Sequence, residues 1–213
     1  MSTGYSTSGR SLVLGIGAIL EWLAILLQFY LHIQNREASA SETVIRFFSY
    51  FTIQCNLIIA CCYTVNLLSP LSATGRFFSR PSTQTAIALY IIVVGLVYNI
   101  ILRSLWAPQG LQYIVDLLLH TLLPLLFTVY WLLFVPKASL TWKNMPPWLI
   151  FPLAYCIYSL IRGSYAKWYP YPFLDLEMLG RRQVIYNIGG MILLFLVIAF
   201  VLIGIARSTR KRP

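Results

Sequence analysis

The sequence predicts an all-α integral membrane protein in which residues 1–213 form one domain, a bundle of six transmembrane helices. Hydrophobic residues make up 59% of the chain and charged residues only 10%, whereas a soluble domain carries about a quarter charged residues. Six apolar runs each have the roughly 20 residues that cross the hydrocarbon core of a bilayer. We expect spans near 11–32, 45–68, 84–106, 112–134, 147–165 and 183–206.

Helix-breaking residues separate these spans. Proline lies in the links near 69–75, 107–110 and 143–147, and glycine also lies in the first two. The first apolar run is long enough for a full crossing, contains Glu21, and is not followed by a small-residue cleavage site. We therefore expect a retained span there and no cleaved signal peptide.

Charge favours a lipid environment over nucleic acid. The formal net charge is +10, but the basic residues lie between apolar runs and in the tail 207–213, where orientation and anionic headgroups require them. With the N-terminus inside, nine basic residues fall on the inner side and seven on the outer side. This bias predicts that both termini are cytoplasmic and that 207–213 is a basic cytoplasmic tail.

The sequence predicts neither a metal site nor a cofactor. All of the cysteines lie within apolar segments without the spacing of a zinc site, so we interpret them as small hydrophobic residues. His32 is placed near the end of a span, which leaves one histidine and few acids for metal ligation. The cysteines are Cys55, Cys61, Cys62 and Cys156.

Polar side chains concentrate near one end of the predicted bundle. Thr52 lies about seven residues into the second span and His120 about eight into the fourth, roughly 10–12 Å below the same edge. The inner halves of spans two to six are expected to be almost wholly apolar. Because polar side chains within a bilayer usually face the bundle interior, this layer predicts a shared cavity. Its other members are Asn56, Asn99, Arg103, Asp116, Arg162, Tyr186 and Asn187.

Asp116 and His120 are four residues apart and therefore share one helix face. A carboxylate at that spacing can orient an imidazole as a general base. The residue whose hydroxyl His120 would activate remains open, and the candidates are Thr52, Thr121, Tyr98 and Ser49. Pro124 is expected to remove a backbone hydrogen bond to His120 and to kink the span. The alternative is a structural polar clasp between Asp116 and His120, with Arg103 as counter-ion.

Three segments carry a family resemblance. Residues 48–56, 116–124 and 169–175 together resemble the androgen-induced gene 1 family of six-span membrane proteins, and the chain is most similar to its bacterial branch. The resemblance implies a threonine hydrolase that cleaves fatty acid esters of hydroxy fatty acids, with Thr52 as nucleophile and His120 as base. It also implies location in the bacterial cytoplasmic (inner) membrane.

The resulting hypothesis is an intramembrane lipid-ester hydrolase. His120, oriented by Asp116, would activate Thr52 to form an acyl-threonine that water then cleaves. The partners are a lipid ester and membrane lipids, with no nucleic acid and no metal. Segment 169–175 would form a lid or, equally, an interfacial aromatic anchor. Candidates for binding the substrate or the oxyanion are Asn56, Asn99, Arg103, Asn187, Tyr186 and Arg162.

The alternative is a non-catalytic membrane protein that binds or transports a lipid or a small molecule through the polar cavity. The two hypotheses differ in what Thr52 does. A hydrolase requires an acyl-threonine, whereas a transporter would tolerate the loss of Thr52 and depend instead on the charges of Asp116 and Arg103.

Overall fold

The computed structural model describes residues 7–208, and these form a helical bundle without strands. Six of its helical segments are long and apolar enough to cross a membrane, which confirms the predicted fold class. The predicted tail 207–213 lies largely outside the described residues, which end at Ser208. The six segments are Ser8–Gln34, Phe51–Leu68, Pro81–Leu105, Gly110–Phe134, Trp142–Ala166 and Leu176–Ser208.

Several of the spans are composed of more than one helical element. The long helices are α1 (Thr7–Gln34), α3 (Phe51–Leu68), α5 (Pro81–Val97), α7 (Leu123–Phe134), α9 (Ile150–Ala166) and α10 (Leu176–Ser208). The shorter elements are α2 (Ala40–Phe48), α4 (Ala73–Phe78), α6 (Gly110–Leu117), α8 (Met145–Trp148), the π-helical turns η1 (Tyr98–Leu102) and η3 (Leu118–Leu122), and the 3₁₀ turns η2 (Arg103–Leu105), η4 (Trp142–Asn144) and η5 (Pro172–Leu174).

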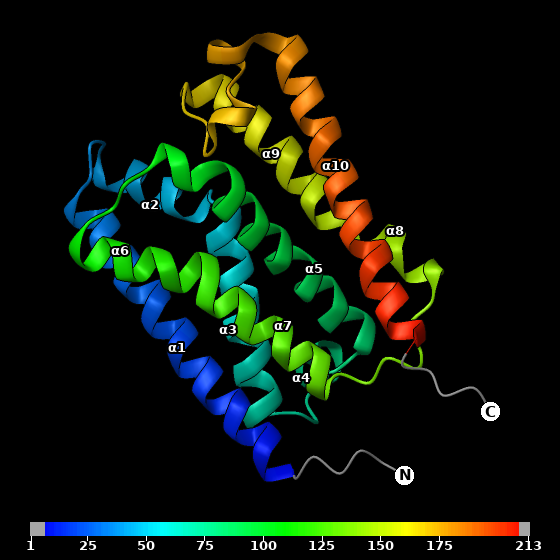
Figure 1. The fold of residues 1–213 in the computed structure, drawn as a ribbon. Coiled ribbons are helices and arrows are strands. Elements are labelled where there is room, and N and C mark those ends of the chain that lie inside the picture. Colours follow the sequence, from blue (N-terminus) through cyan, green and yellow to red (C-terminus); the bar gives the residue numbers. More distant parts are fainter. Residues whose placement is uncertain (1–6, 209–213) are drawn as a thin grey trace.

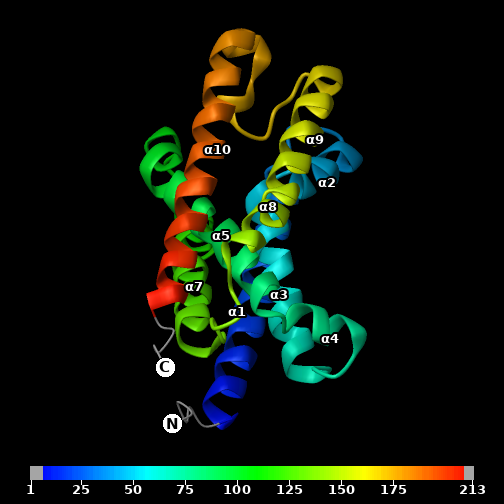
Figure 2. The same cartoon turned by 90° about the vertical axis from the view of Figure 1, so that its right-hand side faces the viewer.

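Helices α3 and α5 lie at the centre of the bundle. Each has more than half of its spanning window buried, a larger share than any other span. Helix α1 packs along α3 on one side, and α10 packs against α5 on the other, next to α9 (Figure 1). The start of α1 and the end of α10 lie at the same end of the bundle in both views (Figures 1 and 2).

Polar contacts, buried or partly buried, join the helices at the end of the bundle opposite the predicted cavity. The Trp131 indole donates to Thr85 Oγ1 at 2.9 Å, and Ser79 Oγ donates to Asn66 Oδ1 at 2.6 Å. Such hydrogen bonds hold helices together where lipid removes the hydrophobic driving force. The expectation of almost wholly apolar inner halves is therefore wrong: Asn66, Gln84 and Thr85 are buried there.

The second span starts later than predicted. Helix α2 ends at Phe48, where the Ser49 hydroxyl donates to the Ile45 carbonyl at 2.7 Å. Tyr50 then has an extended backbone (φ −79°, ψ 128°), and α3 begins at Phe51. Thr52 is thus the second residue of α3 rather than about the seventh of the span. Its backbone N–H belongs to the first turn, where amides have no partner within the helix.

The fourth span contains a π-helical turn directly before Pro124. Proline lacks the N–H that would bond the His120 carbonyl, and Asn99 Nδ2 donates to that carbonyl instead, at 3.1 Å. Gly95 lies opposite, and a Cβ at that position would be 3.4 Å from the same oxygen. The irregularity predicted at Pro124 therefore takes the form of the π-helical turn η3. Asn99 on the neighbouring span supplies the hydrogen-bond donor that proline lacks.

Candidate active site

Asp116 and His120 form a close pair on the fourth span. His120 Nδ1 lies 3.3 Å from Asp116 Oδ1 and 3.0 Å from the Asp116 backbone carbonyl oxygen. Both of these neighbours are acceptors, so they favour the tautomer that carries its proton on Nδ1. This tautomer leaves the Nε2 lone pair free to accept a proton from another group.

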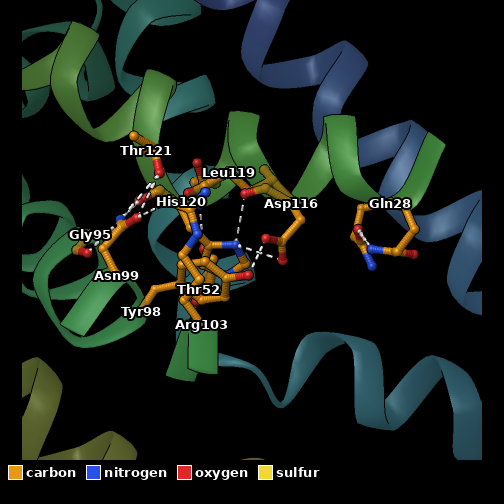
Figure 3. A network of polar contacts seen from close by, with 12 residues as sticks. Gln28, Thr52, Gly95, Tyr98, Asn99, Arg103, Asp116, Leu119, His120 and Thr121 are labelled. Carbon is orange, nitrogen blue, oxygen red and sulfur yellow. Dashed lines mark hydrogen bonds and ion pairs between the residues drawn. The ribbon is translucent and has the colours of Figure 1, made fainter. Parts of the chain in front are cut away.

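Tyr98 completes this pair from the neighbouring span. Its hydroxyl donates to Asp116 Oδ2, and its ring stacks on His120 with the centroids 3.9 Å apart and the planes 16° apart. Each oxygen of the buried Asp116 carboxylate therefore has a defined partner, Tyr98 on one side and His120 on the other (Figure 3). The ring stacking also limits rotation of the imidazole.

Asn99 braces the two π-helical turns that carry these groups. Its Nδ2 lies 2.9 Å from the Gly95 carbonyl, 3.1 Å from the His120 carbonyl and 3.1 Å from Thr121 Oγ1. Arg103 Nη1 donates to Asn99 Oδ1 at 3.2 Å. Single π-helical turns within α-helices occur frequently at functional sites. Here they bring Tyr98 on η1 against His120 on η3.

Thr52 reaches the same region from α3. Tyr171 Oη lies 3.3 Å from the Thr52 backbone nitrogen, which donates to it, and 3.4 Å from Thr52 Oγ1. Asn56 Nδ2 donates to the Thr52 carbonyl at 2.8 Å and lies 3.4 Å from the Leu119 carbonyl, so it ties the first turn of α3 to η3. Within the described residues no hydrogen bond joins Thr52 to His120.

Thr52 and His120 line one cavity of about 680 Å³, which we call the polar cavity. A second cavity of about 190 Å³, the apolar cavity, extends between α5, α9 and α10. It is lined mainly by aliphatic and aromatic side chains, including Val94, Leu153 and Phe195. Four residues line both cavities and therefore mark their junction: Thr52, Tyr98, Leu102 and Tyr171.

The four hydroxyl candidates now differ. Ser49 is buried between the Ile45 carbonyl and the Tyr158 hydroxyl, and Thr121 is bonded to Asn99. Neither lines the polar cavity. Tyr98 lines it but donates its proton to Asp116. Thr52 and Tyr98 both line the two cavities, but the Thr52 hydroxyl has only a long contact, 3.4 Å to Tyr171 Oη.

The segment predicted as a lid or an anchor forms part of the cavity wall, through Pro170, Tyr171 and Pro172. It is held in place beside Trp168, whose ring has the guanidinium groups of Arg46 and Arg162 at 5.0 Å each.

Glu42 holds these two cations together, because its Oε1 lies 2.8 Å from a nitrogen of each. Hydrogen bonding, first from Arg46 and then from Arg162, lowers the pKa of Glu42 below its ordinary value.

Some predicted binding residues lie away from the polar cavity. Arg162 pairs with Glu42. Tyr186 is exposed on α10 and accepts a hydrogen bond from Arg182, and Asn187 donates to the Phe173 carbonyl at 2.9 Å.

Asn99 and Arg103 do lie close to the Asp116–His120 pair (Figure 3), and Asn56 Nδ2 lies 3.4 Å from the carbonyl of Leu119, the residue before His120. However, both amide nitrogens are bonded to backbone carbonyls. Arg103 lines a further cavity of about 200 Å³ together with Asp116 and Thr121, and this cavity adjoins the polar cavity at Asp116.

Two residues of this site were missed by sequence reasoning. Tyr171 belongs to a segment that the sequence singled out, but nothing in a loop sequence indicates which helix its side chain contacts. His32 was set aside because of its position near a span end. It lines the polar cavity, and its ring lies against Phe47 and Tyr50.

The fold and the site define a membrane protein of six spans in which a Tyr–Asp–His cluster and Thr52 line one cavity. No family model, no curated protein and no solved structure matches the chain. Within residues 7–208, no three His, Cys, Asp or Glu side chains are grouped so that they could hold a metal ion.

Proposed function

We propose that this protein is an intramembrane lipid-ester hydrolase with Thr52 as nucleophile and His120 as general base. The observation that carries the proposal is the position of Thr52 at the junction of the two cavities. A lipid ester has an apolar acyl chain on one side of its carbonyl and an alcohol on the other. An ester bound with its acyl chain in the apolar cavity places its carbonyl carbon at Thr52.

The reaction divides into two transfers. His120 Nε2 takes the proton of Thr52 Oγ1 as that oxygen attacks the carbonyl carbon, and the proton then passes to the leaving alcohol oxygen as the ester bond breaks. This step leaves an acyl ester on Thr52. In the second transfer His120 deprotonates a water molecule, which attacks the acyl carbon, releases the fatty acid and restores the Thr52 hydroxyl.

Asp116 and Tyr98 act through His120. The Asp116 carboxylate holds Nδ1–H and stabilises the imidazolium that forms in each transfer, and the Tyr98 hydroxyl fixes the second oxygen of Asp116. The stacked Tyr98 ring keeps the imidazole facing the cavity. Tyr98 and Asp116 are therefore positioning residues in this scheme.

The oxyanion donors we propose are the Thr52 backbone N–H and the Tyr171 hydroxyl. They contact each other at 3.3 Å, next to the attacking oxygen. An oxyanion is stabilised by preorganised donors aimed at the position where the charge develops, and the Thr52 N–H, at the start of α3, bonds the Tyr171 hydroxyl and no backbone carbonyl. Asn56 and Asn99 are less suited, because their amide nitrogens already bond backbone carbonyls.

The resemblance of segments 48–56, 116–124 and 169–175 to the androgen-induced gene 1 family supports the same pair of residues. It also supports location in the bacterial cytoplasmic membrane, which we include in the proposal. A reason for choosing Thr52 that is independent of the resemblance is its hydroxyl at the cavity junction, which has only a long contact of 3.4 Å to Tyr171 Oη.

An active-site probe tests the proposal. A fluorophosphonate with an alkyl chain should label the purified protein, and the label should lie on Thr52. Thr52→Ala should abolish labelling, whereas the matched variant Thr121→Ala, which removes a hydroxyl bonded to Asn99 outside the cavity, should retain it. Labelling that persists in Thr52→Ala, or is absent from the native protein, would contradict the assignment.

A non-catalytic binding or transport protein is the second candidate. The observation that favours it is that no hydrogen bond links Thr52 and His120 in the described residues, while a polar and an apolar cavity meet at Thr52. In that case Thr52→Ala would leave ligand binding intact, and Asp116→Asn would disturb it. Parallel ligand-binding measurements on these two variants separate the candidates.

A further inference from the structure

The ionisable side chains that line the polar cavity do not include lysine or arginine, the side chains that carry a permanent positive charge and bind anions. The cavity is lined by Glu37 at its exposed mouth and by Asp116 in its interior, together with His32 and His120. Neither lysine nor arginine belongs to this lining. A carboxylate or phosphate in the cavity would therefore face two acids and no permanent cation, at close range and in a medium of low dielectric constant.

The arginines nearest to the cavity are occupied elsewhere. Arg103 donates to Asn99 and lines an adjoining cavity of about 200 Å³, which shares Tyr98, Trp106 and Asp116 with the polar cavity. Arg46 is bound by Glu42 and lies over the Trp168 ring. Arg36, next to Glu37 in sequence, donates to the Ile33 carbonyl at 3.3 Å. None of them belongs to the lining of the polar cavity.

The remaining polar wall suits hydroxyl groups. Gln112 Nε2 donates to Gln28 Oε1 at 2.9 Å, a bond that joins α6 to α1. Gln28 lies on the far side of Asp116 from Tyr98 (Figure 3). Gln28 Nε2 and Gln112 Oε1 take no part in this bond. The pair therefore retains a donor on Gln28 and an acceptor on Gln112. Asn35 adds both kinds of group near the mouth. A hydroxyl can donate and accept, and it therefore matches such a surface.

We infer that the polar cavity binds an uncharged, hydroxyl-bearing head group, and that the alcohol released by the hydrolase is a neutral polyol such as glycerol. This inference rests on the proposed function, which orients the ester with its acyl chain in the apolar cavity and its alcohol in the polar cavity. It departs from the resemblance, which implies an alcohol half that carries a carboxylate.

Two uncleavable ethers test the head-group preference without relying on catalysis. The probes are 1-O-hexadecylglycerol and 3-O-hexadecylglyceric acid, which differ only in whether the terminal carbon is a hydroxymethyl group or a carboxylate. Binding is measured on the full chain in nanodiscs of zwitterionic lipid, above neutral pH so that the acid is ionised. The glycerol ether should bind about tenfold more tightly. Equal binding, or tighter binding of the acid, would overturn the inference.

Variants locate the preference in the cavity. Glu37→Gln removes the acid at the mouth and should reduce the preference about threefold by strengthening binding of the acid ether. Glu177→Gln makes the same change on an exposed acid that pairs with Lys167 outside the cavity, and should leave the ratio unchanged. An equal loss of preference in both variants would contradict a role for the cavity.

The hydrolase proposal is tested separately on 1-palmitoylglycerol. If the glycerol ether is preferred but the ester is not cleaved, the hydrolase proposal fails and the head-group preference stands. If the ester of a hydroxy fatty acid is cleaved through Thr52 faster than 1-palmitoylglycerol, the hydrolase proposal stands and the head-group inference fails.

Discussion

The ring of Tyr98 lies flat against the imidazole of His120, 3.9 Å away between centroids. The two residues come from different spans, each at a π-helical turn. Because the Tyr98 hydroxyl also holds Asp116, one side chain sets both the tilt of the imidazole and the carboxylate behind it. In the proposed mechanism this arrangement prepares His120 as a base, and in the alternative interpretation the same contacts form a polar clasp that joins helices.

Removing the Tyr98 hydroxyl should slow the reaction without unfolding the protein. In Tyr98→Phe the ring still stacks on His120 but Asp116 Oδ2 loses its donor, so we expect kcat to fall about tenfold with KM unchanged. Tyr130→Phe is the control, since that hydroxyl contacts Arg10 far from the cavities. Equal effects of the two variants would show that Tyr98 is only structural.

Loss of the Tyr171 hydroxyl should affect the transition state more than binding. Tyr171→Phe removes one proposed oxyanion donor, and we expect kcat to fall roughly 10²-fold while KM changes little. Tyr158→Phe is the matched control, because that hydroxyl contacts Ser49 outside both cavities. A raised KM with unchanged kcat would mean that Tyr171 contacts the substrate and does not stabilise the oxyanion.

Glu42 should stabilise the protein only where it is ionised. Its pKa is lowered by hydrogen bonds from Arg46 and Arg162, so its contribution is fully present above its unfolded pKa and is lost as pH falls through the lower folded value. At neutral pH Glu42→Gln should lower Tm by about 2–4 °C. Thermal melting in detergent should show the native and variant curves converging as pH falls below about 4. A difference that persists in acid would contradict the ionic origin.

Glu21 should destabilise the bundle. It is fully buried in α1, and neither carboxylate oxygen has a hydrogen-bond partner within residues 7–208. Burial of such a group without a partner costs free energy. Glu21→Leu should therefore raise Tm by a few degrees and, because Glu21 lines neither cavity, leave esterase activity within about twofold of native. A lower Tm would show that the carboxyl group has a partner in the folded protein.

The sequence was sufficient for the bundle but not for the site. Apolar runs of bilayer length predict the six spans, because span length is fixed by the membrane. The four-residue spacing likewise predicts the Asp116–His120 contact. The start of α3 could not be predicted, since the hydrophobic run continues through Ser49 and Tyr50 and the break lies in their backbone conformation. For that reason the Thr52 backbone N–H did not emerge as an oxyanion donor.

Contacts between distant segments were also beyond sequence reasoning. The Tyr171 hydroxyl meets Thr52 across 119 residues of chain, and no local pattern encodes such a distance. Depth alone predicts Asn56 and Asn99 as candidates for binding the substrate or the oxyanion, and depth does not reveal whether an amide is already bonded to a carbonyl. In both cases the pattern of hydrogen bonds, and not the type of residue, determines the role.

The central claim is that Thr52 carries the acyl group during catalysis. The most direct measurement mixes the purified protein with 1-palmitoylglycerol, stops the reaction by rapid denaturation, and maps the acyl group by peptide mass spectrometry. We predict a palmitoyl ester on Thr52 in the native protein and none in His120→Ala. Ester cleavage without acylation of Thr52, or an acyl group on another residue, would contradict the account.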